Sequence, residues 1–347
     1  MSTQETLNQS NQSSLAQTLL QMITAPWVTQ SIYVAAKLGI ADLLQDGAKS
    51  SEELAKSTVV DAESLYRVLR ALASIGIFRE DENRHFQLTP MAELLRSGVP
   101  GSLRDVAIMC GGEDWRWQPL GKILYSVKTG KPASDYVNGM PIFEYFGQNP
   151  EAAAIFNAAM TSFSTVETTG VVAAYDFSSI QTLVDVGGGH GSLLTSILQA
   201  NPTLKGIIYD LPSVVAGASQ YLEATGLKER CQVIGGDFFA SVPSGGDAYI
   251  MKHIIHDWYD QRCIKILQNC HQVMPENGKV LVVEAVISGP NEPSVGKFID
   301  IEMLTMTTGG RERTASEYKE LFAAAGFQLT NIIPTPSNVS VIEGVKV

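Results

Sequence analysis

Residues 183–194 read LVDVGGGHGSLL, and this stretch decides the fold. A short apolar run carries an acid, Asp185, the glycine-rich run GGGHG follows at 187–191, and the next residues have helical apolar spacing. This order predicts a strand, a tight turn and the start of a helix, the layout in which a nucleotide-type ligand meets backbone N–H groups. Glycine permits that close approach because it has no Cβ.

The spacing of the glycines separates two kinds of nucleotide site. A dinucleotide fingerprint, G-x-G-x-x-G read from Gly187, requires a glycine where Ser192 stands, whereas the third glycine comes one residue earlier, at Gly191. The pattern acid-x-G-x-G-x-G instead resembles motif I of the S-adenosylmethionine (SAM)-dependent methyltransferases. The alternative is a glycine-rich turn without a ligand, which is disfavoured because turns seldom need so many glycines beside an apolar strand.

Length, charge and cysteine usage exclude several classes of protein. The chain has 347 residues, enough for a large core and two domains. Its net charge is −11, so a nucleic-acid partner is disfavoured. The 4 cysteines lack the paired spacing of a metal site, which favours reduced, packed thiols over a zinc site and predicts no metal.

The sequence predicts neither a membrane span nor a signal peptide. No apolar run approaches the ~18 to 20 residues that a span requires. The polar start, MSTQETLNQSNQSS, lacks a basic region followed by an apolar one. We therefore expect a disordered tail over 1–14 and a cytoplasmic protein.

Residues 15–100 predict a helical module with a small β-wing. Apolar residues recur at helical spacing, Ser50 or Ser51 and then Asp61 are plausible N-caps, and IFREDENRHFQL predicts two short strands around a charged turn. The order resembles a winged helix. One reading is DNA binding, but few cations lie on the expected recognition helix. We favour the other reading, a dimerisation domain that buries the aliphatic first helices in a homodimer.

The rest of the chain changes character twice. Residues 101–170 are rich in aromatic residues and methionine and predict a helical linker that contributes to an apolar acceptor pocket. Residues 171–347 alternate strand-like and helical patterns, with strands expected at LVDV, GIIYD, CQVI, DAYIMK, KVLVVEAVI and NVSVIEGV. This predicts an α/β domain with a Rossmann-like, doubly wound parallel sheet, whose ligands bind at the carboxyl ends of the strands.

Polar residues follow several of these strands. Asp210 ends the second strand, where a carboxylate can accept both ribose hydroxyls, although it can also cap a helix. Asp237 and Phe238 follow the third strand and suit an adenine, although they can also belong to an ordinary turn. Lys252, His253, His256 and Asp257 cluster after the fourth strand.

Two glutamates complete this set. Glu284 interrupts an apolar strand, needs a partner there, and has His256 as its natural candidate. Glu312 follows a glycine pair, and its alternative role is a solvated loop charge.

The ordered motifs together resemble the plant-type small-molecule O-methyltransferases, the family of the caffeic acid and hydroxyindole O-methyltransferases and their bacterial relatives. The segments FNAAMTSFS, VDVGGGHG, YDLP, GGDFF, MKHIIHDW, VVEAVI and GGRERT follow in the family's order. The resemblance covers nearly the whole chain and implies a methyl transfer from SAM to a hydroxyl, without a metal, in a homodimer.

The resemblance also implies a role for individual residues. For catalysis, it implies His256 as the base and Glu284 and Glu312 as the acids that bracket it. The implied SAM contacts are Met160, Ser164, Asp185, Gly187, Gly189, Asp210, Leu211, Asp237, Phe238 and Lys252. The implied acceptor contacts are Trp117, Phe156, Asp257, Met303 and Thr307, and Thr307 stands where many plant members have asparagine.

These roles predict a mechanism. A phenol titrates near ~10, so a base must take its proton, and an imidazole with an ordinary pKa near ~6.5 is mostly neutral at pH 7. We expect Glu284 to orient that ring. Two rival functions remain: a SAM-binding relative with decarboxylase or hydroxylase chemistry, and a SAM-sensing winged-helix regulator. A dinucleotide-dependent dehydrogenase fails on the position of Ser192.

Overall fold

The glycine-rich stretch folds as a strand, a turn and a helix, as predicted. Strand β4 (Thr182–Val186) ends at the turn, and helix α12 (Ser192–Ala200) begins after Gly191, which has a φ of +88°. A Cβ at Gly191 would collide with the Ile208 side chain. This position therefore requires glycine both for its backbone angle and for the space around it.

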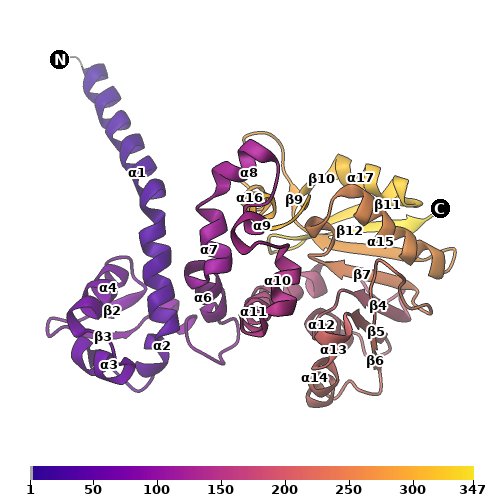
Figure 1. Cartoon of the computed structure of the whole chain (residues 1–347), viewed down its shortest axis with the longest axis horizontal. Helices are drawn as coiled ribbons and strands as arrows, with labels where there is room; N and C mark the ends of the chain where they lie inside the picture. Colours follow the sequence, from indigo (N-terminus) through magenta and orange to yellow (C-terminus); the bar gives the residue numbers. More distant parts are fainter. Residues whose placement is uncertain (1–2) are drawn as a thin grey trace. The chain divides into compact units, whose positions relative to one another are not determined.

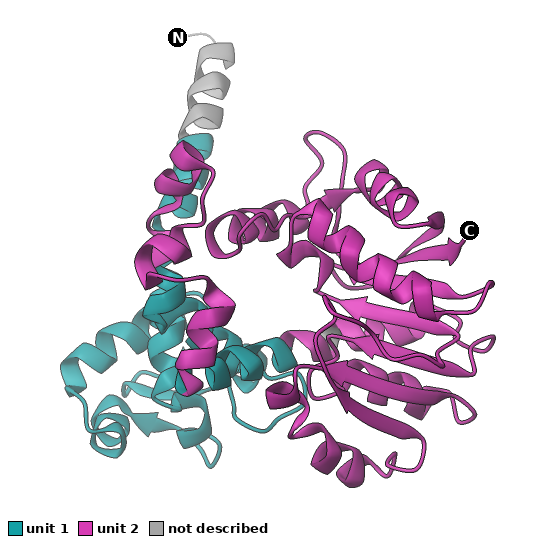
Figure 2. Cartoon of the chain, turned by 45° about the vertical axis from the view of Figure 1, so that its right-hand side comes forward, with its two compact units in different colours: residues 1–117, 151–162 teal, residues 118–150, 163–347 magenta. Residues whose placement is uncertain are grey.

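The computed structural model describes the chain from residue 3, and it describes side chains for residues 14–165 and 167–347. The tail expected over 1–14 lies, apart from Ser14, outside the residues described in full. The chain divides into two units, unit 1 (residues 1–117 and 151–162) and unit 2 (residues 118–150 and 163–347), which Figure 2 shows in two colours. No helix in the described residues has the length and apolar character needed to cross a bilayer.

Unit 2 is built on one large sheet. In the described part of the chain this sheet has 7 strands in the order β11-β12-β8-β7-β4-β5-β6. The five strands from β8 to β6 are parallel, so their carboxyl ends meet at one edge. The strands other than β4 are β5 (Lys205–Asp210), β6 (Cys231–Gly235), β7 (Ala248–Lys252), β8 (Lys279–Glu284), β11 (Phe327–Pro334) and β12 (Ser340–Lys346).

The sheet is mixed, which corrects the expectation of parallel strands throughout. β12 pairs antiparallel with β8, and β11 pairs antiparallel with β12. The sequence analysis missed β11, since its residues alternate irregularly between exposed and half-buried. The strand expected over KVLVVEAVI also ends early, at Glu284, and residues 286–287 form a separate short strand, β9 (Val286–Ile287).

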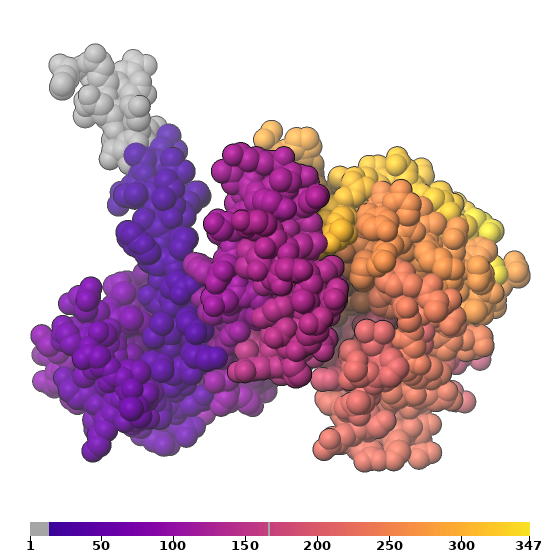
Figure 3. All heavy atoms as spheres, viewed as in Figure 1, coloured from indigo at the N-terminus to yellow at the C-terminus, as the bar shows by residue number. Residues whose placement is uncertain are grey.

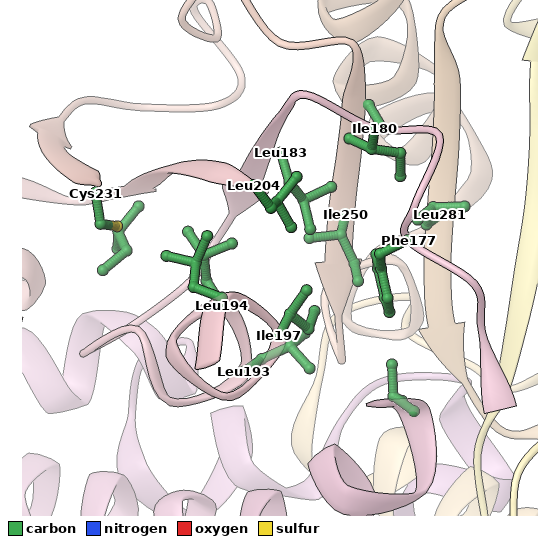
Figure 4. Close-up of a cluster of buried hydrophobic side chains, with 14 of the residues drawn as sticks. Phe177, Ile180, Leu183, Leu193, Leu194, Ile197, Leu204, Cys231, Ile250 and Leu281 are labelled. Atoms are coloured by element: carbon green, nitrogen blue, oxygen red, sulfur yellow. The ribbon is translucent and has the colours of Figure 1, made fainter. Parts of the chain in front are cut away.

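Helices cover both faces of the sheet, and alternate strand residues pack against them. Leu183 and Ile250 face the core under α12, together with Leu194 and Ile197 of that helix (Figure 4). Tyr249, the neighbour of Ile250, belongs to the cluster on the opposite face. The covering helices include α11 (Pro150–Ala174), α13 (Pro212–Val215), α14 (Ala218–Thr225), α15 (Asp260–Val273) and α17 (Ala315–Ala324).

The order of the strands places two segments at opposite ends of unit 2. The segment around α13 and α14 lies beside β6, and the space-filling view shows it away from the yellow C-terminal segment (Figure 3). Unit 2 also contains short elements outside the large sheet. These are α8 (Ile123–Thr129), α9 (Ala133–Asn138), α10 (Ile142–Gln148), the 3-10 helix η1 (Ile255–Asp257), α16 (Gly296–Met306) and β10 (Arg313–Thr314).

Unit 1 has the helices and the wing that the sequence predicts. Ser50 and Asp61 accept hydrogen bonds at the N-termini of α3 and α4, as expected of N-caps. The charged turn joins β2 and β3, and a two-residue strand, β1, adds a third strand to this sheet within the described residues (Figure 1). The elements are α1 (Thr3–Lys37), α2 (Ile40–Leu43), β1 (Lys49–Ser50), α3 (Ser51–Thr58), α4 (Ala62–Ser74), β2 (Phe78–Glu80), β3 (His85–Leu88), α5 (Pro90–Glu93), α6 (Arg104–Gly112) and α7 (Asp114–Leu120).

Candidate active site

The carboxyl ends of β4 and β5 form a cradle of backbone and carboxylate groups. The N–H groups of Gly187 and Gly188 donate to the Tyr209 carbonyl, at 2.8 and 3.2 Å. The Gly189 N–H donates to Asp210 Oδ2 at 2.9 Å. Gly189 has a φ of +59°, and no heavy atom lies within 4 Å of the place where its Cβ would be. The turn therefore leaves open space beside an oriented carboxylate.

Asp185 supplies a second carboxylate beneath this cradle. It is 2 % exposed, and its Oδ2 is one of the buried side-chain atoms without a hydrogen-bond partner among the described residues. Burial raises the pKa of Asp185 to about 7, with the nearby charge of Asp210 adding to the effect and that of Lys252 opposing it. This unsatisfied buried acceptor is available to a polar ligand such as the amino acid or ribose part of SAM.

The other residues that the resemblance assigns to the SAM adenosine lie around the same turn. The Phe238 ring lies 3.8 Å from the position of a Gly187 Cβ, so it borders the glycine turn. Asp237 is exposed, and its Oδ1 accepts the Phe239 N–H at 2.8 Å, which is also the geometry of an ordinary turn. Leu211 is 48 % exposed, and its N–H donates to Asp210 Oδ1.

Lys252, at the end of β7, takes part in a small charged cluster. Its Nζ lies 3.1 Å from Glu167 Oε2, and the same oxygen lies 2.9 Å from His253 Nε2. Although burial opposes it, the charges and hydrogen bonds of His253 and Lys252 lower the pKa of Glu167 to about 2. The His253 ring also stacks on that of His256, with 4.9 Å between centroids. The cluster therefore fastens α11 to the strand end next to His256.

His256 lies on η1 and is 6 % exposed. Its Nδ1 lies 2.6 Å from Glu312 Oε1, and its Nε2 lies 3.8 Å from Asp257 Oδ1. Burial lowers the pKa of the imidazole, but the hydrogen bond that the ring donates to Glu312 and the charges of Asp257 and Glu284 outweigh it and raise the pKa to about 10. The expectation of an imidazole with an ordinary pKa is therefore wrong.

Glu284 holds the backbone around His256 and not its ring, which corrects the expected pairing. Its Oε1 accepts the N–H groups of Ile254, Ile255 and His256 at 3.1, 2.6 and 3.1 Å. Its Oε2 accepts the Tyr318 hydroxyl at 2.7 Å. The carboxylate is 0 % exposed and is satisfied because strand β8 ends directly opposite the first turn of η1.

Glu312, and not Glu284, orients the imidazole of His256. It is 4 % exposed, which excludes a solvated loop charge, and its N–H donates to Asp300 Oδ1 on α16 at 2.8 Å. Its Oε1 contacts His256, whereas its Oε2 has no hydrogen-bond partner among the described residues. The arrangement of carboxylate and imidazole is that of a base whose second ring nitrogen is held by an acid.

Sequence reasoning missed Arg313, the neighbour of Glu312. Its side chain is 0 % exposed and donates to the Ile255 and Trp258 carbonyls and to Asp260 Oδ1. A signal was present, because GGRERT puts an arginine at the start of a helical segment that is otherwise apolar on one side. Nothing in the sequence, however, indicated that this arginine is buried.

The residues expected to contact the acceptor fall into both units. Met303 and Thr307 are buried near the end of α16, and the Thr307 hydroxyl donates to the Met303 carbonyl. A Cβ at Gly310 would collide with Thr307 and would lie 2.5 Å from the His256 carbonyl, so Thr307 lies close to η1. Burial raises the pKa of Asp257 to about 7. The other two expected acceptor contacts, Trp117 and Phe156, belong to unit 1. Of the expected SAM contacts on α11, Met160 belongs to unit 1 and Ser164 to unit 2.

Similarity to known proteins shows the family to which the chain belongs. An O-methyltransferase domain matches residues 117–328, and an O-methyltransferase dimerisation domain matches residues 20–98. The chain is 48 % identical over 330 residues to a phenazine O-methyltransferase of Lysobacter antibioticus. The aligned region covers 95 % of this chain and 96 % of that protein.

Solved structures extend the comparison. The fold matches a crystal structure of LaPhzM with a TM-score of 0.92 at 47 % identity, over 96 % of this chain and 99 % of that one. It also matches NcsB1 in complex with SAM and 2-hydroxy-5-methyl naphthoic acid, with a TM-score of 0.81 at 32 % identity, over 94 % and 98 % of the two chains. The chain belongs to the O-methyltransferase family with an N-terminal dimerisation domain and is a SAM-dependent O-methyltransferase.

Proposed function

We propose that this enzyme methylates a phenolic or enolic hydroxyl of a small aromatic metabolite, with His256 as the general base and without a metal ion. The observation that carries the proposal is the buried His256–Glu312 pair at 2.6 Å. A carboxylate on Nδ1 leaves Nε2 as the ring nitrogen available to a hydroxyl. The base is therefore present in the protein itself.

SAM fits the cradle at β4 and β5, and when bound it supplies a methyl group activated by a sulfonium centre. Asp210 would accept hydrogen bonds from the ribose hydroxyls, since it is already oriented by the Gly189 N–H. Asp185 has a free buried oxygen for a donor. Gly187, Leu211, Asp237, Phe238 and Lys252 would surround the rest, and Met160 and Ser164 of α11 are assigned to the methionine part by the family resemblance.

His256 must be neutral before it can accept the proton of the acceptor hydroxyl. With a pKa of about 10, the imidazole carries a second ring proton at neutral pH. One proton must therefore leave before the ring can accept that of the acceptor. A phenol also titrates near ~10, so transfer between the two groups is nearly balanced in free energy. Glu312 then stabilises the imidazolium that results.

The acceptor is proposed to be a flat aromatic molecule. Relatives are named for phenazine, 3-amino-4-hydroxybenzoate and 2,7-dihydroxy-5-methyl-1-naphthoate as methyl acceptors. Apolar residues on α16 suit such rings, and Met303 lies there with Thr307. Trp117, Phe156 and Asp257 complete the proposed acceptor contacts.

A homodimer through unit 1 is the proposed assembly. Helix α1 exposes a series of large apolar side chains, of which Trp27 is 73 % and Leu15 70 % exposed. Single exposed apolar residues are ordinary, but a continuous series along one helix favours burial against a second copy. The others in the series are Leu19, Leu20, Met22, Ile23 and Val28.

A screen of acceptors tests the proposed reaction. The enzyme, dialysed against a chelator, is incubated with SAM and a panel of phenols, hydroxynaphthoates and hydroxyphenazines, and products are scored by the mass gain of one methyl group. We expect methyl ethers without added metal. Loss of carbon dioxide or gain of oxygen would instead support the rival chemistry, and a requirement for added magnesium would contradict the metal-free proposal.

A further inference from the structure

Arg313 contacts the backbone of the segment that carries His256 at two points. Its Nη1 donates to the Ile255 carbonyl at 3.1 Å, and its Nη2 donates to the Trp258 carbonyl at 2.9 Å. These carbonyls lie on either side of His256 in the chain. One guanidinium therefore fixes the length and direction of the turn on which the imidazole stands.

The guanidinium is itself held in place by an acid. Its Nε and Nη2 both donate to Asp260 Oδ1, at 3.1 and 2.8 Å, at the start of α15. The side chain of Arg313 is 0 % exposed, so its donors depend on these protein acceptors, whereas the carboxylate of Asp260 also reaches solvent. A planar fork with fixed donors can satisfy two carbonyls and a carboxylate at once, whereas a lysine ammonium cannot match this geometry.

Glu284 binds the same turn through its backbone N–H groups, whereas Arg313 binds backbone carbonyls. The carboxylate of Glu284 accepts three successive N–H groups of residues 254–256, while Arg313 donates to the carbonyls of 255 and 258. Both side chains are fully buried and carry opposite charges. The turn thus has its donors bound by an anion and its acceptors bound by a cation, which leaves its backbone little freedom.

We propose that Arg313 is a positioning residue for methyl transfer: it holds η1 so that the His256 imidazole keeps its hydrogen bond to Glu312 and points at the acceptor. The inference rests on the proposed function, in which His256 is the base. Arg313 follows Glu312 directly in the chain. One short segment therefore supplies both the carboxylate that contacts the His256 imidazole and the guanidinium that binds the backbone carbonyls of η1 and Trp258.

The test uses the full-length enzyme with Arg313→Lys and a matched control, Arg230→Lys. Arg230 also donates to several backbone carbonyls, those of Leu198, Asn201, Pro202 and Leu204, but at the far end of α12. We expect Arg313→Lys to lower kcat by about 30-fold. It should leave the SAM dissociation constant, measured by calorimetry, within about twofold, and Arg230→Lys should leave kcat within about threefold.

The pH profile distinguishes positioning from a general loss of stability. If Arg313 maintains the bond between Glu312 and His256, Arg313→Lys should shift the alkaline rise of kcat/KM to lower pH, because the weakened bond raises the imidazole pKa less. A reduced kcat with an unshifted profile would overturn the proposal. Should Arg313→Lys fail to fold, Asp260→Asn loosens the same guanidinium and should give a smaller shift in the same direction; no shift there would overturn it as well.

A double-mutant cycle separates this inference from the proposed function. In a His256→Asn background, Arg313→Lys should cause no further loss of kcat, since its effect passes through the imidazole. Additive losses would overturn the role of Arg313 while leaving His256 as the base. Full activity of His256→Asn alone would instead remove the proposed function, whatever Arg313 does.

Discussion

The two halves of the candidate site are built on opposite principles. The cradle at the ends of β4 and β5 is open: Gly189 borders empty space and a buried oxygen of Asp185 has no partner among the described residues. The half around η1 is closed, since His256, Glu284 and Arg313 are buried. The two latter side chains bind backbone groups of η1, and the His256 imidazole is hydrogen-bonded to Glu312.

This difference fits the proposed roles of the two halves, SAM binding in the first and proton transfer in the second. Polar groups that await a ligand must stay unsatisfied until the ligand arrives, and they are tolerated because the site is small. Groups that move a proton must already hold their geometry, because reorganising them during reaction adds to the barrier. Substitutions in the open half should therefore change affinity for SAM, and those in the closed half should change turnover.

The largest effect is expected from His256→Asn. Removing the base should lower kcat by ~10² to 10⁴ while SAM still binds with its usual affinity, because the cradle is separate from the ring. Single-turnover rates and calorimetry measure the two quantities. His271→Asn is the control, because that ring lies on α15 and contacts the Val347 carbonyl. Equal kcat for His256→Asn and the parent enzyme would remove the assignment of the base.

The activity should also rise steeply with pH. Since the pKa of His256 is raised to about 10, the fraction of the imidazole that is neutral increases about tenfold per pH unit between pH 7 and 9. We expect kcat/KM to rise with it for an acceptor that does not titrate in this range. A plateau already at pH 7 would show that the imidazole is neutral in the working enzyme.

The same pKa affects stability in the opposite direction. The imidazolium is favoured in the folded state, so its contribution is complete below the unfolded pKa of ~6.5 and is lost as pH rises through about 10. The Tm should therefore fall between pH 7 and 10, and less so in His256→Asn. Parallel Tm profiles for the two proteins would contradict this linkage.

Glu284→Gln sharpens the comparison through the backbone of η1. Replacing a buried carboxylate that accepts three N–H groups should lower the free energy of unfolding by about 3 kcal/mol, and kcat by roughly tenfold. Glu343→Gln is a matched control on the adjacent strand, since Glu343 is also buried and accepts a tyrosine hydroxyl, that of Tyr175, at 2.6 Å. It should lower stability alone; if both variants lose kcat equally, the effect is not specific to η1.

Asp210→Asn tests the open half. The amide keeps the size of the side chain but loses the charge, so SAM affinity should fall by roughly tenfold while kcat at saturating SAM changes little. Asp247→Asn is the control, because Asp247 also accepts two backbone N–H groups, at the opposite end of β4. A drop in kcat with unchanged SAM affinity would contradict the division of the site into two halves.

Local patterns predicted most of the fold. The helix caps at Ser50 and Asp61 and the strand–turn–helix at 183–194 depend on neighbours within a few residues, and the structure confirms them. The antiparallel strand β11 was missed, because pairing along an edge depends on a partner that comes later in the chain. Hydrophobic alternation cannot show which strand lies beside which.

The candidate site was predicted by residue type but not by partner. The sequence brought His256, Glu284 and Glu312 together as one constellation, yet it assigned the ring to Glu284. Glu312 contacts the ring across 56 positions, and Glu284 contacts the backbone N–H of His256 across 28. Two glutamates that both reach a histidine cannot be told apart without the positions of their strands.

By itself, then, the sequence determined the glycine turn, the order of the motifs and the class of the ligand, since each follows from spacing and side-chain chemistry over short distances. The tertiary structure alone decided that Arg313 is buried, that Glu312 orients His256, and that the imidazole is strongly basic. The physical reason is that burial and long-range hydrogen bonds set the charge of a group, and neither is encoded in its immediate neighbours.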